Sequence, residues 1–301
     1  MNMKVDLCGV TLNNPVMTAS GTFGSGAEYA EFVDLNKLGA VVTKGVANVP
    51  WPGNPTPRVA EVYGGMLNAV GLQNPGIDLF VERDIPFLKQ FDTKIMVNVC
   101  GHSTEEYIEV VERLRDQPVD LLEINISCPN VKEGGIAFGQ DPKAVEAITK
   151  EMKKHAAQPV IMKLSPNVTD ITEMARAAEA GGADGLSLIN TITGMKIDIN
   201  RQKFVLANKT GGMSGPAIHP VAVRMVYQTA QAVRLPIVGM GGIMNAEDAI
   251  EMILAGATAV SVGTANFTNP HVTEEIVAGI RDYMERYQVA DIKDLVVAVH
   301  E

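Results

Sequence analysis

Residues 120–130 are Asp-Leu-Leu-Glu-Ile-Asn-Ile-Ser-Cys-Pro-Asn, an apolar run that ends in polar, loop-forming residues. The first five predict a buried strand. That strand delivers the amide of Asn125 and the thiol of Cys128 to its C-terminal end, in a loop that also contains Gly134 and Gly135. A lone cysteine near apolar residues is usually a packing residue. Because the neighbours of Cys128 are polar, the stretch favours a general base or nucleophile acting above the strand ends.

Similar runs recur along the chain and alternate with helical segments. Eight strands alternating with eight helices predict a parallel (β/α)8 barrel, a TIM barrel of the α/β class. The expected strands are Val16–Ala19, Ala40–Thr43, Ile95–Val99, Leu121–Ile126, Val160–Leu164, Gly185–Ile189, Ile237–Met240 and Ala259–Val262.

The helical segments carry their own start and stop signals. Capping boxes, an N-cap followed by proline, and C-terminal glycines are the patterns expected at helix ends. They occur at Ser103 with Glu106, at Asp170 with Glu173, at Asn269-Pro270, and at Gly39 and Gly256.

Two connections, 44–94 and 190–236, are too long for plain turns between a strand and a helix. Both leave C-terminal strand ends, which form the catalytic face of such barrels. Within the second, 196–208 alternates like a hairpin, and a short hairpin is also expected at 4–12. No repeat, low-complexity tract or linker divides the chain, so we expect one domain over residues 1–301 with long insertions at the catalytic face.

Composition narrows the class of protein. The net charge is -10, with no cluster of Lys and Arg, which argues against nucleic acid or an anionic membrane as the main partner. The three cysteines are widely spaced and predict no zinc or iron–sulfur site on this chain. Reduced thiols, together with no signal peptide and no apolar run of membrane-spanning length, favour a soluble, cytoplasmic protein.

Polar residues and glycines follow the expected strands. Several lysines and asparagines at buried strand ends are best explained by one polar binding site, since burying them unpaired is costly. Loops after the seventh and eighth strands of such barrels hold phosphate, and here both contain glycine. No GxGxxG motif occurs in a βαβ setting, so a mononucleotide is favoured over a dinucleotide. Gly211–Gly215 is expected to close over the same ligand.

These motifs resemble those of dihydroorotate dehydrogenases, and among them the class 1B, NAD-linked catalytic subunits most closely. The resemblance covers nearly the whole chain. It rests on ASGTFG (19–24), GNPTPR (53–58), NAVGLQNPG (68–76), NISCPNVKEGG (125–135), KLSPNVTDI (163–171), INT (189–191), GGMSGPAI (211–218), GMGGI (239–243) and SVGTANF (261–267).

The resemblance implies FMN at the top of the barrel and a carboxylate-bearing cyclic ureide as substrate. Lys44 would pair with the substrate carboxylate, and asparagine amides suit the paired N–H and C=O edge of the ring. The implied FMN residues are Ser20, Gly21, Lys44, Gly45, Asn98, Asn125, Lys163, Ile189, Gly215, Gly241, Gly242, Gly263 and Thr264, with the phosphate on the last four. The implied substrate residues are Lys44, Asn68, Ala69, Val70, Gly71, Leu72, Asn125, Asn190 and Thr191.

The implied reaction is oxidation of (S)-dihydroorotate to orotate in pyrimidine biosynthesis. Cys128 would take a proton from C5, flavin N5 would accept the hydride from C6, and Lys163 would stabilise the charge on the reduced flavin. From the residues themselves, Gly134-Gly135 is either a hinge that lets the Cys128 loop open for substrate and close to exclude water, or an ordinary surface turn. Electrons would pass to NAD through a partner subunit carrying FAD and [2Fe–2S], in a heterotetramer of two plus two chains.

Four alternatives are less favoured. A class 1A, fumarate-linked dihydroorotate dehydrogenase shares the cysteine but differs around 44–54 and at GLQNPG. A dihydrouridine synthase shares an FMN barrel but has to bind tRNA, which the acidic balance disfavours. A phosphosugar isomerase would keep the phosphate loops and lack flavin. A non-catalytic binding subunit would not need Cys128.

Overall fold

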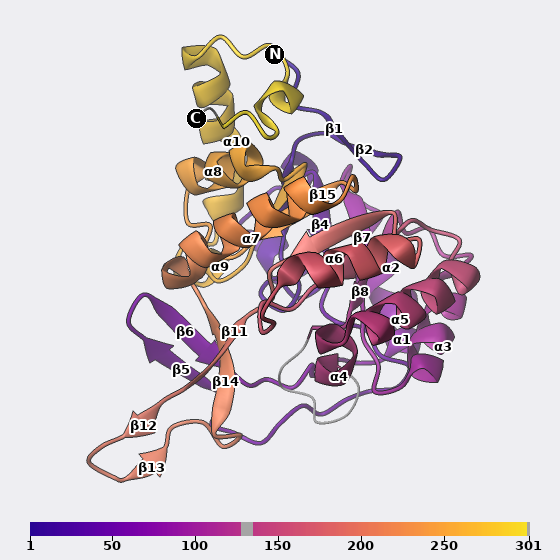
Figure 1. Ribbon diagram of the computed structural model, residues 1–301, viewed down its shortest axis with the longest axis vertical. Helices are drawn as coiled ribbons and strands as arrows, with labels where there is room; N and C mark the ends of the chain where they lie inside the picture. Colours follow the sequence, from indigo (N-terminus) through magenta and orange to yellow (C-terminus); the bar gives the residue numbers. More distant parts are fainter. Residues whose placement is uncertain (128–134, 300–301) are drawn as a thin grey trace.

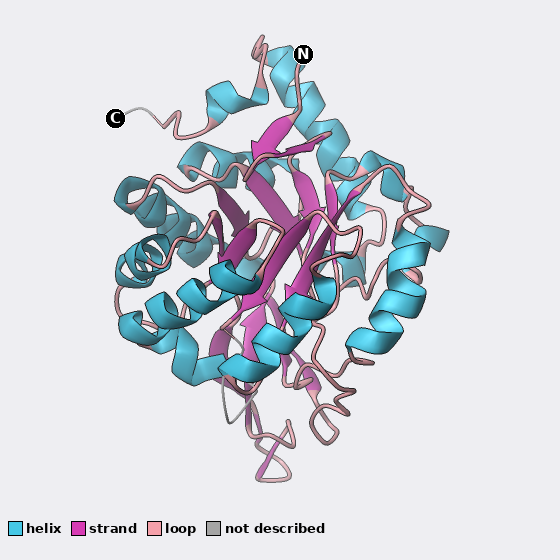
Figure 2. Ribbon diagram, turned by 90° about the vertical axis from the view of Figure 1, so that its right-hand side faces the viewer, coloured by secondary structure: helices cyan, strands magenta, loops and turns pink. Residues whose placement is uncertain are grey.

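The computed structural model describes residues 1–127 and 135–299, with side chains of 135–137 left aside. Its centre is a closed barrel of eight parallel strands, which confirms the predicted fold (Figure 2). The strands follow one another around the barrel in chain order, and the last pairs with the first. They are β3 (Val16–Thr18), β4 (Ala40–Val42), β7 (Lys94–Val99), β8 (Leu121–Asn125), β9 (Val160–Lys163), β10 (Gly185–Leu188), β15 (Ile237–Met240) and β16 (Ala259–Val262).

The barrel strands are buried on both faces. Every residue of β8, β9, β10, β15 and β16 is buried, including Glu123, Lys163 and Ser187. Their apolar, β-branched composition follows from this position, because a parallel sheet has its interior on one side and helices on the other. The polar residues among them are therefore the exceptions that need partners.

Helices form the outer layer (Figure 2). Ser103 Oγ accepts from Glu106 N at 3.3 Å and Asp170 accepts from Thr172 N at 2.8 Å, so both predicted N-caps are confirmed. Gly256 ends its helix at φ +125° and is confirmed as a C-cap.

The long helices are α3 (Thr104–Leu114), α5 (Pro142–His155), α6 (Ile171–Ala180), α7 (His219–Ala232), α8 (Ala246–Ala255) and α10 (Val272–Arg286). The short ones are α1 (Ile77–Leu79), η3 (Phe80–Asp84), α2 (Ile85–Leu88), α4 (Gly135–Gln140), α9 (Ala265–Thr268) and the 3-10 turns η1 (Tyr29–Glu31), η2 (Leu35–Lys37), η4 (Pro216–Ile218) and η5 (Ile292–Leu295).

Two helix expectations are wrong, and a third is met in part. The first crossover contains only η1 and η2, because positive-φ glycines interrupt it at 21, 24 and 26. Gly39 is not a C-cap; a Cβ there would lie 2.1 Å from the Asn14 carbonyl oxygen, so close packing explains the glycine. The helix α10 is assigned from Val272, with His271 directly before it. Asn269 nevertheless makes the hydrogen bond expected of an N-cap followed by proline, because its Oδ1 accepts from His271 N at 3.0 Å, and it also ends α9.

The two long connections together build a second sheet above the C-terminal ends of the barrel strands. The first connection supplies β5 (Val59–Val62) and β6 (Gly65–Asn68), and the second supplies β11 (Ile192–Met195) and β14 (Thr210–Ser214). They pair in the order β11-β14-β6-β5. The predicted hairpin is confirmed as β12 (Ile197–Asp198) and β13 (Lys203–Phe204), which project furthest from the barrel (Figure 1).

The opposite end of the molecule carries both termini and the predicted N-terminal hairpin, β1 (Val5–Leu7) and β2 (Val10–Leu12) (Figure 1). Cys8, at the hairpin turn, lies against Gly185 at the start of β10: a Cβ on Gly185 would be 2.7 Å from its Sγ. In the described residues, no helix combines the length and apolar character needed to cross a membrane.

Candidate active site

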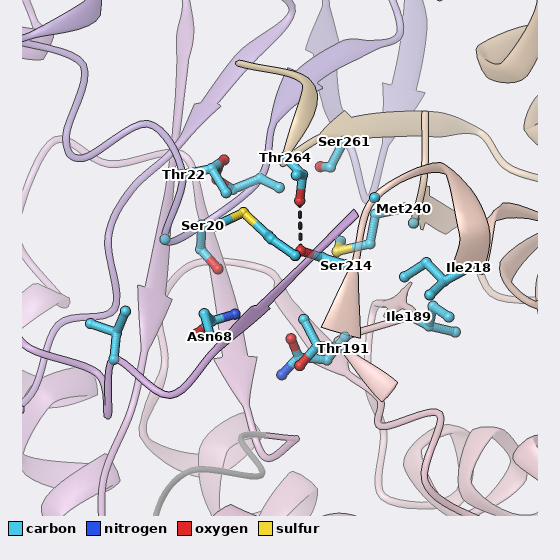
Figure 3. Close-up of a pocket in the computed structure, with 18 of the residues that line it drawn as sticks. Ser20, Thr22, Asn68, Ile189, Thr191, Ser214, Ile218, Met240, Ser261 and Thr264 are labelled. Atoms are coloured by element: carbon cyan, nitrogen blue, oxygen red, sulfur yellow. Dashed lines mark hydrogen bonds between the residues drawn. The ribbon is translucent and has the colours of Figure 1, made fainter. Parts of the chain in front are cut away.

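A cavity of about 190 Å³ lies at the C-terminal end of the barrel, and residues of β5, β6 and β14 line it as well (Figure 3). It brings together most of the residues that the sequence predicts for a binding site. These are Ser20, Gly21, Lys44, Gly45, Asn68, Val70, Gly71, Leu72, Asn98, Asn125, Lys163, Ile189, Asn190, Thr191, Gly215, Gly241, Gly242, Gly263 and Thr264.

Among the predicted catalytic, cofactor and substrate residues, Ala69 and Cys128 are not placed in the cavity wall. Ala69 is fully buried with Ala60, Leu67 and Leu206, and its N–H donates to the Arg58 carbonyl. Its side chain packs on the face of the second sheet opposite to that of Met66 and Asn68, which line the cavity. Cys128 and Gly134 lie outside the described residues. Ser127, the last described residue before that segment, is buried at the end of β8.

A buried ion pair lies at the floor of the cavity, with Lys163 lining it and Glu123 beneath. Lys163 Nζ lies 3.4 Å from Glu123 Oε2 and donates to Ser20 Oγ at 3.0 Å; both charged side chains are nearly inaccessible, at 4% and 1% exposure. Glu123 also accepts from Asn98 Nδ2 at 2.6 Å and from Ser187 Oγ at 2.7 Å. All of these neighbours are donors, which suits an ionised carboxylate, an acceptor only.

Strand register assembles this floor. Asn98 on β7 is opposite Glu123 on β8, and Lys163 on β9 is opposite both Asn125 and Ser187. Residues opposite one another on neighbouring strands place their side chains on the same face. The apolar residues before and after them set the register, and the register in turn brings the polar groups together.

A chain of amides runs from the floor towards the cavity wall. Asn125 Nδ2 donates to Asn98 Oδ1 at 3.2 Å, and Asn125 Oδ1 accepts from Ser127 Oγ at 3.0 Å. Asn190 Nδ2 then donates to both Oγ and the carbonyl oxygen of Ser127, at 2.9 and 3.0 Å. Each amide orientation is fixed by its neighbour, so the polar half of the cavity is ordered in advance of any ligand.

The other side of the cavity is made of backbone. Gly241 and Gly242 have φ values of +126° and +71°, and a Cβ on Gly242 would lie 2.7 Å from His219 Cβ and 2.9 Å from the Gly215 carbonyl oxygen. His219 Nδ1 lies 2.9 Å from the Gly241 carbonyl oxygen, which ties α7 to this loop. Only glycine gives this path, and it leaves the backbone close to whatever the cavity holds.

Hydroxyl and apolar groups complete that side. Thr264 Oγ1 donates to Ser214 Oγ at 2.7 Å, the bond dashed in Figure 3. Among the described residues, Ser261 Oγ is buried at the cavity without a hydrogen-bond partner in the protein. A glycine cradle with an unpartnered hydroxyl beside it fits a phosphate-bearing group, and the apolar side chains near it fit a flat ring. These apolar residues are Val59, Met66, Ile189, Ile218, Met240, Met244 and Phe267.

The sequence prediction missed two kinds of residue. The pattern of residues 120–124 hides Glu123 in an apolar run, although a lone carboxylate in a buried strand is itself an indication of a polar network. Val59, Met66, Ser214, Ile218, Met244 and Phe267 come mostly from the long connections, and no local pattern shows where those connections fold.

The cavity at the top of this (β/α)8 barrel has a phosphate-type cradle on one side and ordered amides with a lysine on the other. This combination defines a cofactor-dependent barrel enzyme. The family model for dihydroorotate dehydrogenase matches residues 2–284. The chain belongs to the dihydroorotate dehydrogenase family, which is a flavin-dependent family of oxidoreductases.

Named relatives agree along the full length. A protein of Lachnoclostridium phytofermentans named "Dihydroorotate dehydrogenase B (NAD(+)), catalytic subunit" is 72% identical over 299 residues, covering 99% of this chain and 100% of its own. One of the same name from Geotalea uraniireducens is 54% identical, covering 99% and 98%. A solved structure of the Eimeria tenella enzyme with ferulenol superimposes with a TM-score of 0.82 at 22% identity, covering 98% and 88%, and shows the fold alone.

Proposed function

We propose that this chain oxidises dihydroorotate to orotate in pyrimidine biosynthesis, as the catalytic subunit of an NAD-linked dihydroorotate dehydrogenase. The observation that carries the proposal is the gathering of the predicted lysines, asparagines and glycines around one cavity of the expected fold. The family membership and the names of the full-length relatives support the same conclusion.

The cofactor in this proposal is FMN. Its phosphate would lie on Gly241, Gly242, Gly263 and Thr264, where the backbone path and Ser261 Oγ favour an anion. When bound, FMN supplies the acceptor for the hydride. Lys163 would hold a positive charge beside it, because its ammonium is fixed between Ser20 and Glu123.

The substrate would lie over the amide side of the cavity. Asn125 and Asn190, already oriented by Ser127, offer donors and acceptors to the ureide edge, with Asn68, Gly71, Leu72 and Thr191 around it. Lys44, on the loop after β4, lines the same cavity and would pair with the substrate carboxylate.

Cys128 is the proposed general base, one residue beyond the buried Ser127. Its thiolate would remove the proton from C5 while the hydride leaves C6, so that a proton and a hydride, which carries both electrons, leave along separate routes. A free thiol has a pKa of about 8.5, so turnover is expected to increase towards alkaline pH.

Anaerobic titration with dihydroorotate tests the assignment. The wild-type protein should bleach its flavin absorbance. Cys128→Ala should retain flavin and bind orotate, yet lose reduction rate by about 10²–10⁴-fold, the usual range for a lost general base. Cys8→Ala, at the other end of the barrel, is the matched cysteine control. Rapid reduction in Cys128→Ala, or a wild-type protein without flavin, would contradict the proposal.

The electron acceptor is the second part of the proposal. The relatives' name, catalytic subunit, implies a separate partner chain. We propose that this partner carries FAD and [2Fe–2S] and joins a heterotetramer of two plus two chains. The isolated chain should then reduce an artificial dye with dihydroorotate but produce little NADH until the partner is added. NAD reduction by the single chain, or preference for fumarate, would overturn this part.

A further inference from the structure

Glu123 is the one carboxylate among the described residues that lies inside the barrel beneath the cavity, and the proposed reaction does not use it. Its side chain is 1% exposed, so it does not line the cavity and cannot contact a substrate there. It nevertheless contacts three polar residues, two of which, Asn98 and Lys163, do line the cavity.

We propose that Glu123 is a positioning residue that supplies the counter-charge of Lys163 and fixes how Asn98 presents its amide. An ionised carboxylate accepts only, so Asn98 has to turn Nδ2 towards Glu123 and Oδ1 towards Asn125. The same oxygen, Oε2, faces Lys163 Nζ at 3.4 Å. Ser187, on the far side, donates to Oε1 and holds the carboxylate in place.

The counter-charge has a consequence for a flavin bound above Lys163, and this step rests on the proposed function. A lysine without a partner would favour the reduced, negatively charged flavin strongly. With Glu123 beneath it, the pair has no net charge, so reduced flavin is stabilised less. The reduced flavin can then pass the electrons that it took from the substrate to the next acceptor. Glu123 therefore acts on the flavin through Lys163 and not by contact.

Glu123→Gln separates charge from shape. Glutamine can keep its Oε1 towards Asn98 and Lys163 and donate from Nε2 to Ser187 Oγ, so the hydrogen bonds survive while the charge is lost. The midpoint potential of the bound flavin should increase, by at least the ~30 mV that corresponds to a tenfold tighter relative binding of the reduced form in a two-electron couple. Glu123→Asp retains the charge and should stay closer to the wild-type potential.

The control is Glu285→Gln, which removes the same charge from an exposed position on α10. Its potential should equal that of the wild type, which excludes an effect of overall charge. An unchanged or lower potential in Glu123→Gln, or an equal shift in Glu123→Asp, would overturn the counter-charge role. If the wild-type protein binds flavin but does not oxidise dihydroorotate, the proposed function is refuted. The midpoint potentials of the variants can still be compared in that case.

A second measurement requires neither flavin nor substrate turnover. Urea unfolding of the purified chain is compared for Glu123→Gln, Lys163→Met and the double variant. If the two side chains are charge partners, the double variant should be more stable than Glu123→Gln alone, because no buried charge is left unpaired. If Glu123→Gln does not fold, recovery of folding in the double variant is the supporting result. A double variant no more stable than Glu123→Gln would refute the pairing.

Discussion

A lysine–carboxylate pair lies near each end of strand β9, and the two pairs differ in their surroundings. At the C-terminal end, Lys163 and Glu123 are buried among amides and hydroxyls beneath the cavity. At the N-terminal end, Lys153 pairs with Asp184, which also accepts from Val160 N, and both side chains are about one-third exposed. One pair is held in a buried network beneath the candidate site, whereas the other ties α5 to the N-terminal end of the barrel.

The difference shows how an ion pair with a chemical role can be distinguished from a structural one. Water screens Lys153 and Asp184, so each can lose its partner and be solvated. Neither Lys163 nor Glu123 has that option, so each depends on the other. Burial of both partners, with polar side chains continuing towards a cavity, is what marks the C-terminal pair.

The largest expected effect comes from removing Lys163, with removal of Lys153 as the comparison. Lys163→Met should lower the free energy of unfolding by about 3 to 5 kcal/mol, because it leaves Glu123 buried without its counter-charge. Lys153→Met should lower it by about 1 kcal/mol or less, as for a partly exposed pair. Urea unfolding followed by circular dichroism measures both. Equal losses would show that the two pairs are energetically alike and remove the basis of the comparison.

Glycines give a second contrast between the ends. Gly242 and Gly9 both have positive φ, +71° and +83°, but a Cβ on Gly242 would meet His219 and Gly215, while Gly9 has open space within 4 Å. Gly9→Ala should therefore cost only the backbone strain, about 1 to 2 kcal/mol. Gly242→Ala adds a steric clash of about 1 to 3 kcal/mol and should also weaken flavin retention.

Thermal or urea unfolding measures the loss of stability in each variant, and a parallel flavin titration measures the loss of flavin affinity. Flavin affinity should be unaffected by Gly9→Ala, since that residue lies in the β1–β2 turn at the opposite end. Weakened flavin binding in both variants would mean that general destabilisation, and not the shape of the Gly241–Gly242 loop, controls retention.

The barrel was predictable because each of its strands is an apolar run between turn formers, and one such run suffices to identify a strand. The second sheet was not. Asn68 pairs with Gly212 across 144 residues, and β6 and β14 are short and rich in glycine. Gly212 is glycine because a Cβ would lie 1.9 Å from Thr191 Oγ1, a reason that exists only once the chain has folded.

The candidate site divides in the same way. Lys163 and Asn125 end their strands and the glycine loops follow theirs, so their meeting at one end of the barrel follows from the fold. Glu123 lies within a strand, where its neighbours Leu122 and Ile124 conceal it, and its partner Asn98 is known only from strand register. Cys128 remains a prediction from the sequence, supported by the position of Ser127.

The smallest expected effect concerns Cys8, at the N-terminal end. Burial raises the pKa of its thiol to about 12, and Asp184 and Asp6 add to the increase. The pKa in the unfolded chain is near 8.5 to 9. Between these values the unfolded state has lost the proton that the folded state retains, so the stabilisation is complete below about pH 8.5 and falls as pH increases.

Urea unfolding between pH 8 and pH 10 should therefore show an alkaline loss of stability that Cys8→Ala reduces, by about 1 to 2 kcal/mol at pH 10. The difference between the two proteins isolates Cys8 from tyrosines that titrate in the same range. The raised pKa also keeps Cys8 protonated at pH 7.5, so iodoacetamide should modify it slowly compared with the proposed base Cys128. Alkylation of Cys8 at a rate equal to that of Cys128 at pH 7.5, together with identical pH profiles for wild type and Cys8→Ala, would place the thiol in water. The Cys8 thiol would then not be packed against the N-terminal end of the barrel, contrary to its position beside Gly185.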